Sequence, residues 1–318
     1  MSELEVYLGI DTSCYTTSVA FMDRQANLVG ESRQILKVHE GKCGLQQSEM
    51  VFQHTRNLPE MITNAMPRGA KIIGVCASGY PRPLPDSYMP AFLVGAGLAR
   101  SVSVLNNIPL WLISHQENHL LAGKWSAGGP DDERFLFLHA SGGTTDLLTA
   151  EKDGSGSYKL TEIGGSIDLH AGQFIDRIGV SLGLQFPAGP ALEKFAGAAA
   201  GPVELPVSVK GCKASLSGPA TAAERKLAAG EDPAGIALGV QKVLAETFYR
   251  LIYNACGEYN TKSVLIAGGV ASNTYIREYL HNKLTGRKIS LWHPQARFSC
   301  DNASGCAAFA VLKGEKSV

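Results

Sequence analysis

Two segments of this 318-residue chain repeat one pattern, in which a strand, a hydroxyl-rich turn and a second strand follow each other. The first segment runs from Glu5 to Met22, with Thr12–Thr17 as its turn. The second runs from Phe135 to Glu151, with Ala140–Asp146 as its turn. A chain that carries one supersecondary unit twice is expected to form two related lobes.

Both turns are candidate phosphate sites, because backbone N–H groups and hydroxyls of a tight turn can bind phosphate oxygens. The second turn offers three hydroxyls next to two glycines, which permit close backbone approach: Ser141, Gly142, Gly143, Thr144 and Thr145. The first turn follows Asp11, a candidate catalytic acid that could position Mg²⁺. An ordinary hairpin with a polar turn is the alternative for the first segment.

The composition excludes several classes of protein. Lys+Arg and Asp+Glu number 29 each, without a long run of one sign, so an RNA partner would need help from other proteins. No stretch approaches the roughly 18 apolar residues of a membrane span, and no signal segment opens the chain, so we expect a cytoplasmic protein. The seven cysteines are scattered and form no C-x-x-C motif, which argues against a disulfide framework and a zinc knuckle.

Small and acidic residues at 126–133 form the best candidate linker and predict lobes at 1–125 and 130–318. In the second lobe, Ser263–Asn273 predicts a strand that runs through a glycine turn into a helix, a geometry that binds nucleotides at strand ends. The acids Asp168 and Asp176 lie near one side of a predicted helix, before a Gly-Pro turn. Carboxylates there could accept ribose hydroxyls, and helix capping is the alternative role.

His115 and His119 are four residues apart on a predicted helix, so both rings share one face, as a metal site requires. A solvated helix face is the alternative. Asp301 lies at a predicted helix start, where it could cap the helix or bind a metal. Gln116 follows the first histidine and Glu117 comes one place late, so the glutamate that zinc peptidases use as a base is missing.

Seven motifs occur in order along the chain: Leu8–Cys14, Pro109–His119, Ser141–Thr145, Asp168–Asp176, Pro187–Glu193, Ala267–Asn273 and Asp301–Ala303. Together they resemble the transferases that make threonylcarbamoyladenosine in tRNA, formerly called O-sialoglycoprotein endopeptidases or glycoproteases. The resemblance implies the α/β fold of the sugar kinase, heat-shock-70 and actin superfamily. In that fold two lobes with duplicated mixed sheets, flanked by helices, enclose a central ligand cleft.

The resemblance also implies the ligands and their residues. One divalent metal, iron or zinc, would bind His115, His119 and Asp301, with His139 as a candidate fourth ligand or a histidine bonded to backbone. ATP or a carbamoyl-type adenylate would bind residues that fall into a phosphate loop, a ribose site and an adenine site. These are His139, Ala140, Ser141, Gly142, Gly143, Thr144 and Thr145; Asp176, Gly189 and Glu193; and Gly268, Gly269 and Asn273.

The implied reaction is transfer of a threonylcarbamoyl group to the adenosine next to the tRNA anticodon. Several family residues are replaced here, with Tyr15, Thr16, Leu169, Gln173 and Ala220 where the family has charged side chains, and with Asn118 where it has Gly or Ala. The alternative is therefore a divergent paralogue, accessory or regulatory, that binds nucleotide and metal, or one that transfers to another acceptor. Homo- and hetero-oligomers are both compatible with the sequence.

Overall fold

The computed structural model describes residues 3–38, 44–154 and 156–315, and the chain forms two compact units. Of these described residues, those within 3–128, 152–158 and 297–315 belong to unit 1, and Gly129–Glu151 and Lys159–Ala296 belong to unit 2. The first boundary falls inside the predicted linker. The C-terminal segment, however, belongs to unit 1 and not to the second lobe as predicted, because its helix packs on the first sheet.

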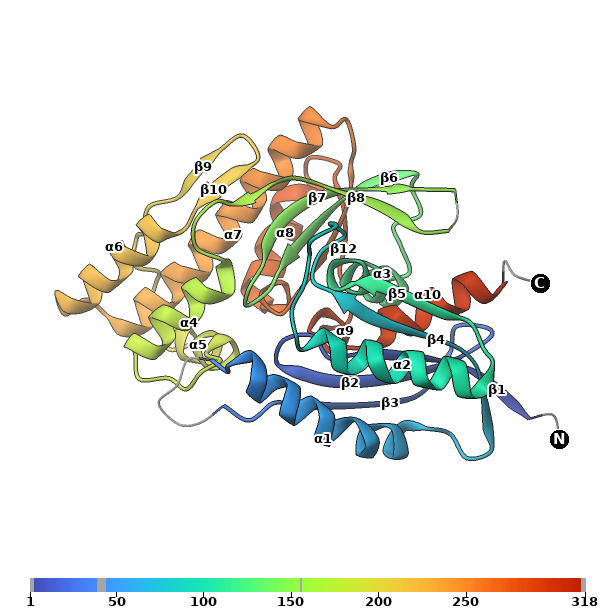
Figure 1. Ribbon diagram of the computed structural model, residues 1–318. Helices are drawn as coiled ribbons and strands as arrows, with labels where there is room; N and C mark the ends of the chain where they lie inside the picture. Colours follow the sequence, from blue (N-terminus) through green and yellow to red (C-terminus); the bar gives the residue numbers. More distant parts are fainter. Residues whose placement is uncertain (1–2, 39–43, 155, 316–318) are drawn as a thin grey trace. The chain divides into compact units, whose positions relative to one another are not determined.

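Unit 1 is built on a five-stranded sheet in the order β3-β2-β1-β4-β5 (Figure 1). Its strands are β1 (Leu4–Asp11), β2 (Thr16–Asp23), β3 (Leu28–Ile35), β4 (Ala70–Tyr80) and β5 (Leu110–Ser114). Its long helices are α1 (Gln47–Ala65), α2 (Phe92–Asn106), α3 (His115–Ala127) and α10 (Ser304–Glu315), and the short α9 (Ala296–Ser299) precedes α10. The first three strands form an antiparallel meander, whereas β4 and β5 add in parallel.

Strand β1 is buried on both faces, and its side chains alternate between two sets of helices. Val6, Leu8 and Ile10 pack with core residues of α1 and α2. The other face receives α10, because a Cβ atom on Gly9 would lie 2.3 Å from the carbonyl oxygen of Ala303. Asp11 shares this second face by the same alternation. Because side chains alternate along β1, the buried Asp11 lies on the face of the strand that is turned toward α10.

Unit 2 repeats this sheet with an added hairpin, in the order β12-β11-β6-β7-β8-β10-β9. The strands are β6 (Arg134–Ala140), β7 (Thr145–Lys152), β8 (Tyr158–Ser166), β9 (Ser208–Lys210), β10 (Lys213–Ser215), β11 (Ser263–Ala267) and β12 (Ser290–Trp292). Strands β8-β7-β6-β11-β12 correspond in order to β3-β2-β1-β4-β5, and β11 and β12 again add in parallel. The predicted duplication is therefore a duplicated sheet topology.

The helices of unit 2 pack on one face of its sheet in a single large core. They are α4 (Ala171–Ser181), α5 (Gly189–Ala196), α6 (Ser217–Ala228), α7 (Pro233–Glu258) and α8 (Thr274–Thr285), and the 3-10 turn η1 (Val270–Ser272) precedes α8. Helix α7 is the longest and carries Val240, Leu244 and Phe248 into this core. The side chain of Asp232 caps its first N–H groups, and Pro233 occupies the first helical position, where no N–H is needed.

In the part of the chain that the structure describes, no helix is long and apolar enough to cross a membrane. The six described cysteines are free thiols, and Cys43 lies outside the described residues.

Candidate metal centre and nucleotide-binding residues

The two histidines are positioned by an abrupt change from strand β5 to helix α3. Ser114 ends the strand, and its hydroxyl accepts from the Glu117 N–H while the Glu117 carboxylate accepts from the Ser114 N–H. This capping box starts the helix at His115, so His119 follows one turn later on the same face. The glutamate beside the histidines is therefore committed to capping.

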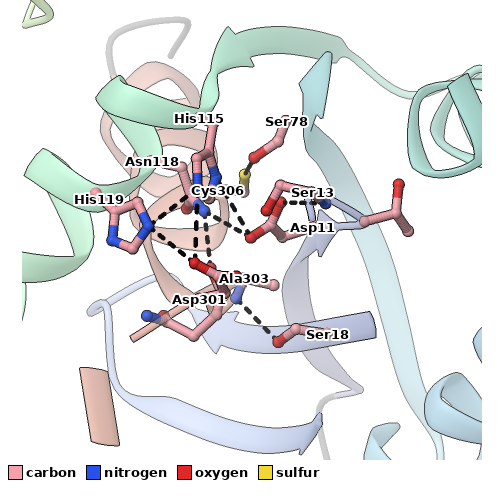
Figure 2. Close-up of polar contacts among 12 residues, drawn as sticks. Asp11, Ser13, Ser18, Ser78, His115, Asn118, His119, Asp301, Ala303 and Cys306 are labelled. Atoms are coloured by element: carbon pink, nitrogen blue, oxygen red, sulfur yellow. Dashed lines mark hydrogen bonds and ion pairs between the residues drawn. The ribbon is translucent and has the colours of Figure 1, made fainter. Parts of the chain in front are cut away.

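His115, His119 and Asp301 meet in a small triangle in unit 1 (Figure 2). The Nε2 atoms of the histidines are 3.1 Å apart, and Asp301 Oδ1 lies 3.2 Å from His119 Nε2 and 3.6 Å from His115 Nε2. Metal–ligand bonds of about 2.0–2.2 Å place neighbouring ligand atoms of a tetrahedral site roughly 3.3–3.5 Å apart. The three atoms thus fit one face of a tetrahedral iron or zinc site, with further positions for a substrate oxygen or another ligand.

Asp11 lies behind His115 and is fully buried. Its Oδ2 is 3.8 Å from His115 Nδ1 and accepts a hydrogen bond of 3.2 Å from the Asn118 amide, and its Oδ1 accepts from the Ser13 N–H. A carboxylate on the far nitrogen of a ligand histidine orients that ring. This position suits Asp11 to supporting His115, in contrast to the Mg²⁺-positioning role predicted from its place at a strand end.

Burial sets the charge balance of the cluster. It raises the pKa of Asp11 to about 7, with the nearby Asp301 adding to the effect. It lowers the pKa of His115 to about 3, so the imidazole is neutral and has a lone pair for a metal. Burial also acts to raise the pKa of Asp301, but the hydrogen bond with His119 and the electrostatic interactions with His115 and His119 hold that pKa below its ordinary value. A neutral His115 imidazole beside a second imidazole and a carboxylate is a suitable donor set for a divalent metal.

The start of helix α10 separates the two roles proposed for Asp301. The Asn302 side chain accepts from the Ser304 N–H at 3.0 Å and so caps this end of the helix, whereas Asp301 points to the histidines. The Asn118 amide donates to the Asn302 carbonyl at 2.8 Å, and its oxygen accepts from the Cys306 N–H at 2.8 Å. Asn118 therefore connects α3 to both β1 and α10.

The hydroxyls of the first turn are largely engaged within unit 1. Thr12 donates to the Ala91 carbonyl and accepts from the Gly95 N–H. Thr17 contacts His54 Nδ1 at 2.9 Å. The Ser13 side chain is buried beside Asp11 and acts to lower the pKa of that carboxyl. The first turn thus offers less to a phosphate than its sequence indicates.

The second turn forms a tight loop against the start of α4, within unit 2. The Ser141 N–H donates to the Thr144 carbonyl at 2.8 Å, and the Thr145 hydroxyl accepts from the Ala171 N–H at 2.7 Å. A Cβ atom on Gly172 would lie 2.4 Å from the Cα atom of Gly142, so this approach requires glycine. Loop N–H groups, hydroxyls and a helix N-terminus are thereby gathered in one place, which is a suitable arrangement for phosphate.

The remaining nucleotide residues predicted in unit 2 lie around the starts of α5 and α8. Asp176 Oδ1 accepts from the Ala188 N–H next to Gly189, and Glu193 accepts from the Thr274 N–H at 2.8 Å. Asn273 caps α8 through the Ile276 N–H and donates to Gln241. Gly268, which precedes Gly269, has φ +109° and approaches the Ala140 carbonyl so closely that a Cβ atom would lie 2.1 Å from its oxygen. The strand ends of β6 and β11 thus meet at the phosphate loop.

Two predicted residues have different surroundings from these. His139 is fully buried at the end of β6 and stacks on Phe137, and it belongs to unit 2 whereas the other three metal candidates belong to unit 1. Asp168 accepts hydrogen bonds from the Leu169 and Leu216 N–H groups and from the Ser215 and Ser217 hydroxyls. Burial raises its pKa, but these bonds outweigh it and lower the pKa overall. Asp168 therefore joins β10 to the loop before α4.

Asn118 and Asn302 are the site residues that sequence reasoning did not assign. In the sequence Asn118 stands out only as a departure from the family pattern, although its spacing of three from His115 and one from His119 puts it beside the face of the two histidines. That spacing was the available signal. For Asn302 the signal is its place just before the last predicted helix, a position typical of a capping side chain.

Several solved structures share the fold. Component A of (R)-2-hydroxyglutaryl-CoA dehydratase from Acidaminococcus fermentans aligns with TM-score 0.57 and 17% identity, over 98% of this chain and 99% of that one. HypF from T. kodakarensis aligns with TM-score 0.62 and 14% identity, over 99% of this chain and 48% of that one. A ROK family glucokinase from Streptomyces griseus aligns with TM-score 0.52 and 12% identity, over 98% of this chain and 99% of that one. The predicted α/β fold with duplicated mixed sheets is confirmed.

The sequence relatives are more specific. The tRNA N6-adenosine threonylcarbamoyltransferase of Methanopyrus kandleri is 28% identical over 86% of this chain and 77% of its own length. The protein of the same name from Nitrosomonas eutropha is 28% identical over 96% of this chain and 91% of its own length. The family model described as tRNA N6-adenosine threonylcarbamoyltransferase matches residues 88–308. This range includes the three candidate metal ligands and every residue predicted here to bind the nucleotide. The chain therefore belongs to the tRNA N6-adenosine threonylcarbamoyltransferase family.

Proposed function

We propose that this chain is a metal-dependent transferase that moves a threonylcarbamoyl-type group from an adenylate to the adenosine next to the anticodon of tRNA. The observation that carries the proposal is the triangle of His115, His119 and Asp301, whose edges of 3.1, 3.2 and 3.6 Å suit a tetrahedral ion. Family membership supplies the reaction class. Iron or zinc bound there would act as a Lewis acid toward a carbonyl or phosphoryl oxygen of the donor.

In this proposal the residues of the chain bind and orient the donor. The loop from His139 to Thr145 and the N-terminus of α4 hold phosphate oxygens, as their N–H groups and hydroxyls permit. Asp176 and Glu193 each keep a carboxylate oxygen for ribose hydroxyls, because their hydrogen bonds within the described part of the chain use only one oxygen of each. Asp11 orients His115 and takes no direct part in transfer.

The acceptor requires further components. With 29 basic and 29 acidic residues the chain has no net charge at pH 7, so its own electrostatic attraction for tRNA is weak. We propose that partner proteins supply most of the tRNA-binding surface. A relative from Methanothermobacter thermautotrophicus, 26% identical over 96% of this chain and 55% of its own length, is named a probable bifunctional tRNA threonylcarbamoyladenosine biosynthesis protein.

The second candidate is a catalytically altered paralogue with an accessory or regulatory role, or one that uses another acceptor. Ala220 stands where the family has a lysine, and it is fully buried in unit 2. Gln173 stands where the family has a glutamate, and its amide oxygen accepts from the His170 N–H at the start of α4. A buried alanine and a neutral capping amide supply neither charge nor proton transfer. The nucleotide and metal residues are retained in either case.

The experiment compares wild-type protein with His119→Ala and with Lys124→Ala, a control at the other end of α3. Metal content is measured by elemental analysis, and transfer is measured from threonylcarbamoyl-adenylate to tRNA. We expect about one metal per chain in the wild type and the control, and loss of metal and of product in His119→Ala. Nucleotide binding without transfer would support the paralogue. Purification free of metal, with no product in any sample, would overturn the proposal.

A further inference from the structure

A second group of polar side chains lies in unit 2, and it includes none of the nucleotide residues described above. It lines a pocket of about 400 Å³ with Arg277, Glu278, His281, Asn282 and His293. The first four residues share one side of α8, because they are spaced by one, four and five positions. His293 follows the last residue of β12. The volume lies in the range of small-molecule sites.

The position of the pocket in the sheet is typical of a ligand site. Strands β6, β11 and β12 are parallel neighbours, so their carboxyl ends lie along one edge of the sheet. The phosphate loop follows β6, Gly268 follows β11, and His293 follows β12. Ligands of open α/β sheets bind beyond the carboxyl ends of the strands. The pocket lies at this same edge of the sheet, next to the end of its last strand, β12.

Arg277 brings an unneutralised positive charge to this pocket. It is half-buried, and one N–H donates to the Pro294 carbonyl at 3.2 Å. Among the described residues no carboxylate pairs with it, in contrast to Arg177 and Arg250, which bind Glu224 and Glu246. Burial lowers its pKa from the ordinary value, although a guanidinium stays charged in proteins. A partly desolvated guanidinium with N–H groups to spare favours an anionic partner.

His293 supplies the second observation. Both ring nitrogens are buried, and neither has a hydrogen-bond partner among the residues that the structure describes. Burial lowers the pKa of this imidazole to about 4, and the charges of Arg277 and His281 act in the same direction. The ring is therefore neutral, with one donor and one acceptor to satisfy. Buried polar atoms are rarely left without partners in proteins, so the ring nitrogens indicate a bound group.

We propose that this pocket binds a phosphate group, either of a free nucleotide or of an RNA backbone. Donors reach the pocket from Arg277, His281 and His293, which lie on two different elements, and so suit the several oxygens of a tetrahedral anion. Asn282 and Glu278 can accept a sugar hydroxyl next to that phosphate. The site is separate from the residues assigned to the adenylate, and its test is a binding measurement that does not depend on transfer.

The test uses the full-length protein with inorganic phosphate, AMP and a short RNA hairpin as probes in calorimetry and fluorescence anisotropy. AMP and the hairpin are added without ATP, so that no other phosphate competes for the pocket, and the adenylate site is the same in every variant. Arg277→Gln removes the charge, and His293→Phe keeps a ring while removing both nitrogens. Arg287→Gln is the matched control, since this exposed arginine lies near the same helix and contacts Tyr253 instead of the pocket.

We expect Arg277→Gln and His293→Phe to weaken binding of at least one probe by about tenfold, and Arg287→Gln to change it by less than about twofold. If phosphate and AMP show the loss, the ligand is a free phosphate compound. If only the hairpin shows it, the ligand is an RNA backbone. Equal losses in Arg287→Gln would indicate unspecific charge attraction and would overturn the proposal. So would probes that do not bind, or binding that neither pocket variant changes.

Discussion

Asn118 joins three segments of unit 1 through one buried amide, which contacts Asp11, the Asn302 carbonyl and the Cys306 N–H. Replacing it by alanine leaves these buried groups without partners, and each such group costs about 1–3 kcal/mol. We expect Asn118→Ala to lower the free energy of unfolding by about 3 kcal/mol and to weaken metal binding. Urea unfolding with and without a chelator measures both. Asn106→Ala, an exposed asparagine on α2, should change stability by less than about 0.5 kcal/mol.

His54 makes unit 1 sensitive to acid. The ring is fully buried, its Nδ1 contacts Thr17, and burial lowers its pKa to about 4 from an ordinary 6.5. The unfolded chain therefore takes up a proton below pH 6.5, while the folded chain does so only near pH 4. The contribution of His54 to stability is complete above pH 6.5 and is lost as the pH falls toward 4, by up to about 3 kcal/mol.

The corresponding variant is His54→Gln, whose amide can still contact Thr17. We expect its unfolding free energy to fall less steeply than that of the wild type between pH 6.5 and 4. Denaturant unfolding at a series of pH values measures the difference between the two curves, which cancels the effect of the other histidines. Parallel curves would mean that His54 takes up its proton at the same pH in the folded and unfolded chains.

Spacing alone predicts that the two candidate metal-binding histidines act as a pair, because a helix fixes which residues share a face. His115 and His119 could be paired from the sequence, and Asp301 came from the family resemblance. The roles of Asp11 and Asn118 could not be predicted, since they depend on contacts between residues 107 positions apart. A sequence pattern predicts which nearby residues share a face, but it does not predict which distant residue a buried amide contacts.

At the scale of elements, the strand–turn–strand units were predictable because apolar runs and polar turns alternate within a few residues. The packing of α10 on β1 was not predictable, although it places Asp301 beside the two candidate metal-binding histidines. It depends on a close approach at Gly9, where any side chain would meet the backbone of Ala303 and Ala307. The glycine is visible in the sequence, but its partner lies almost 300 residues away.

At the start of α10, the proposed metal binding belongs to Asp301 and the helix capping belongs to its neighbour Asn302. Asp301→Asn should lose most bound metal, while the stability of the metal-free protein changes by about 1 kcal/mol or less, because Asp301 does not cap the helix. Asn302→Ala should lose about 2 kcal/mol of stability, because the cap is removed, and should keep its metal. Elemental analysis and unfolding of both variants form the test. Wild-type metal content in Asp301→Asn would remove Asp301 from the site.

At the scale of the whole molecule, the linker at 126–133 was found from its composition, and the first boundary falls there. The return of residues 297–318 to unit 1 could not be inferred, because nothing local distinguishes a helix that completes its own lobe from one that completes the other. As a result the metal candidates from α3 and from the segment before α10 belong to one unit, and the predicted nucleotide residues belong to the other.

This division predicts that metal and nucleotide stabilise different units when each is added alone. A ligand slows local opening of the structure that holds it, and amide hydrogen exchange reports that opening by segment. We expect zinc or iron to slow exchange in α3 and around Asn302–Cys306, and ATP to slow it in the loop 140–145 and in α4. His115→Ala should abolish the effect of metal and keep that of ATP. Protection of 139–145 by metal alone would identify His139 as a fourth ligand, and metal protection that survives in His115→Ala would contradict the site.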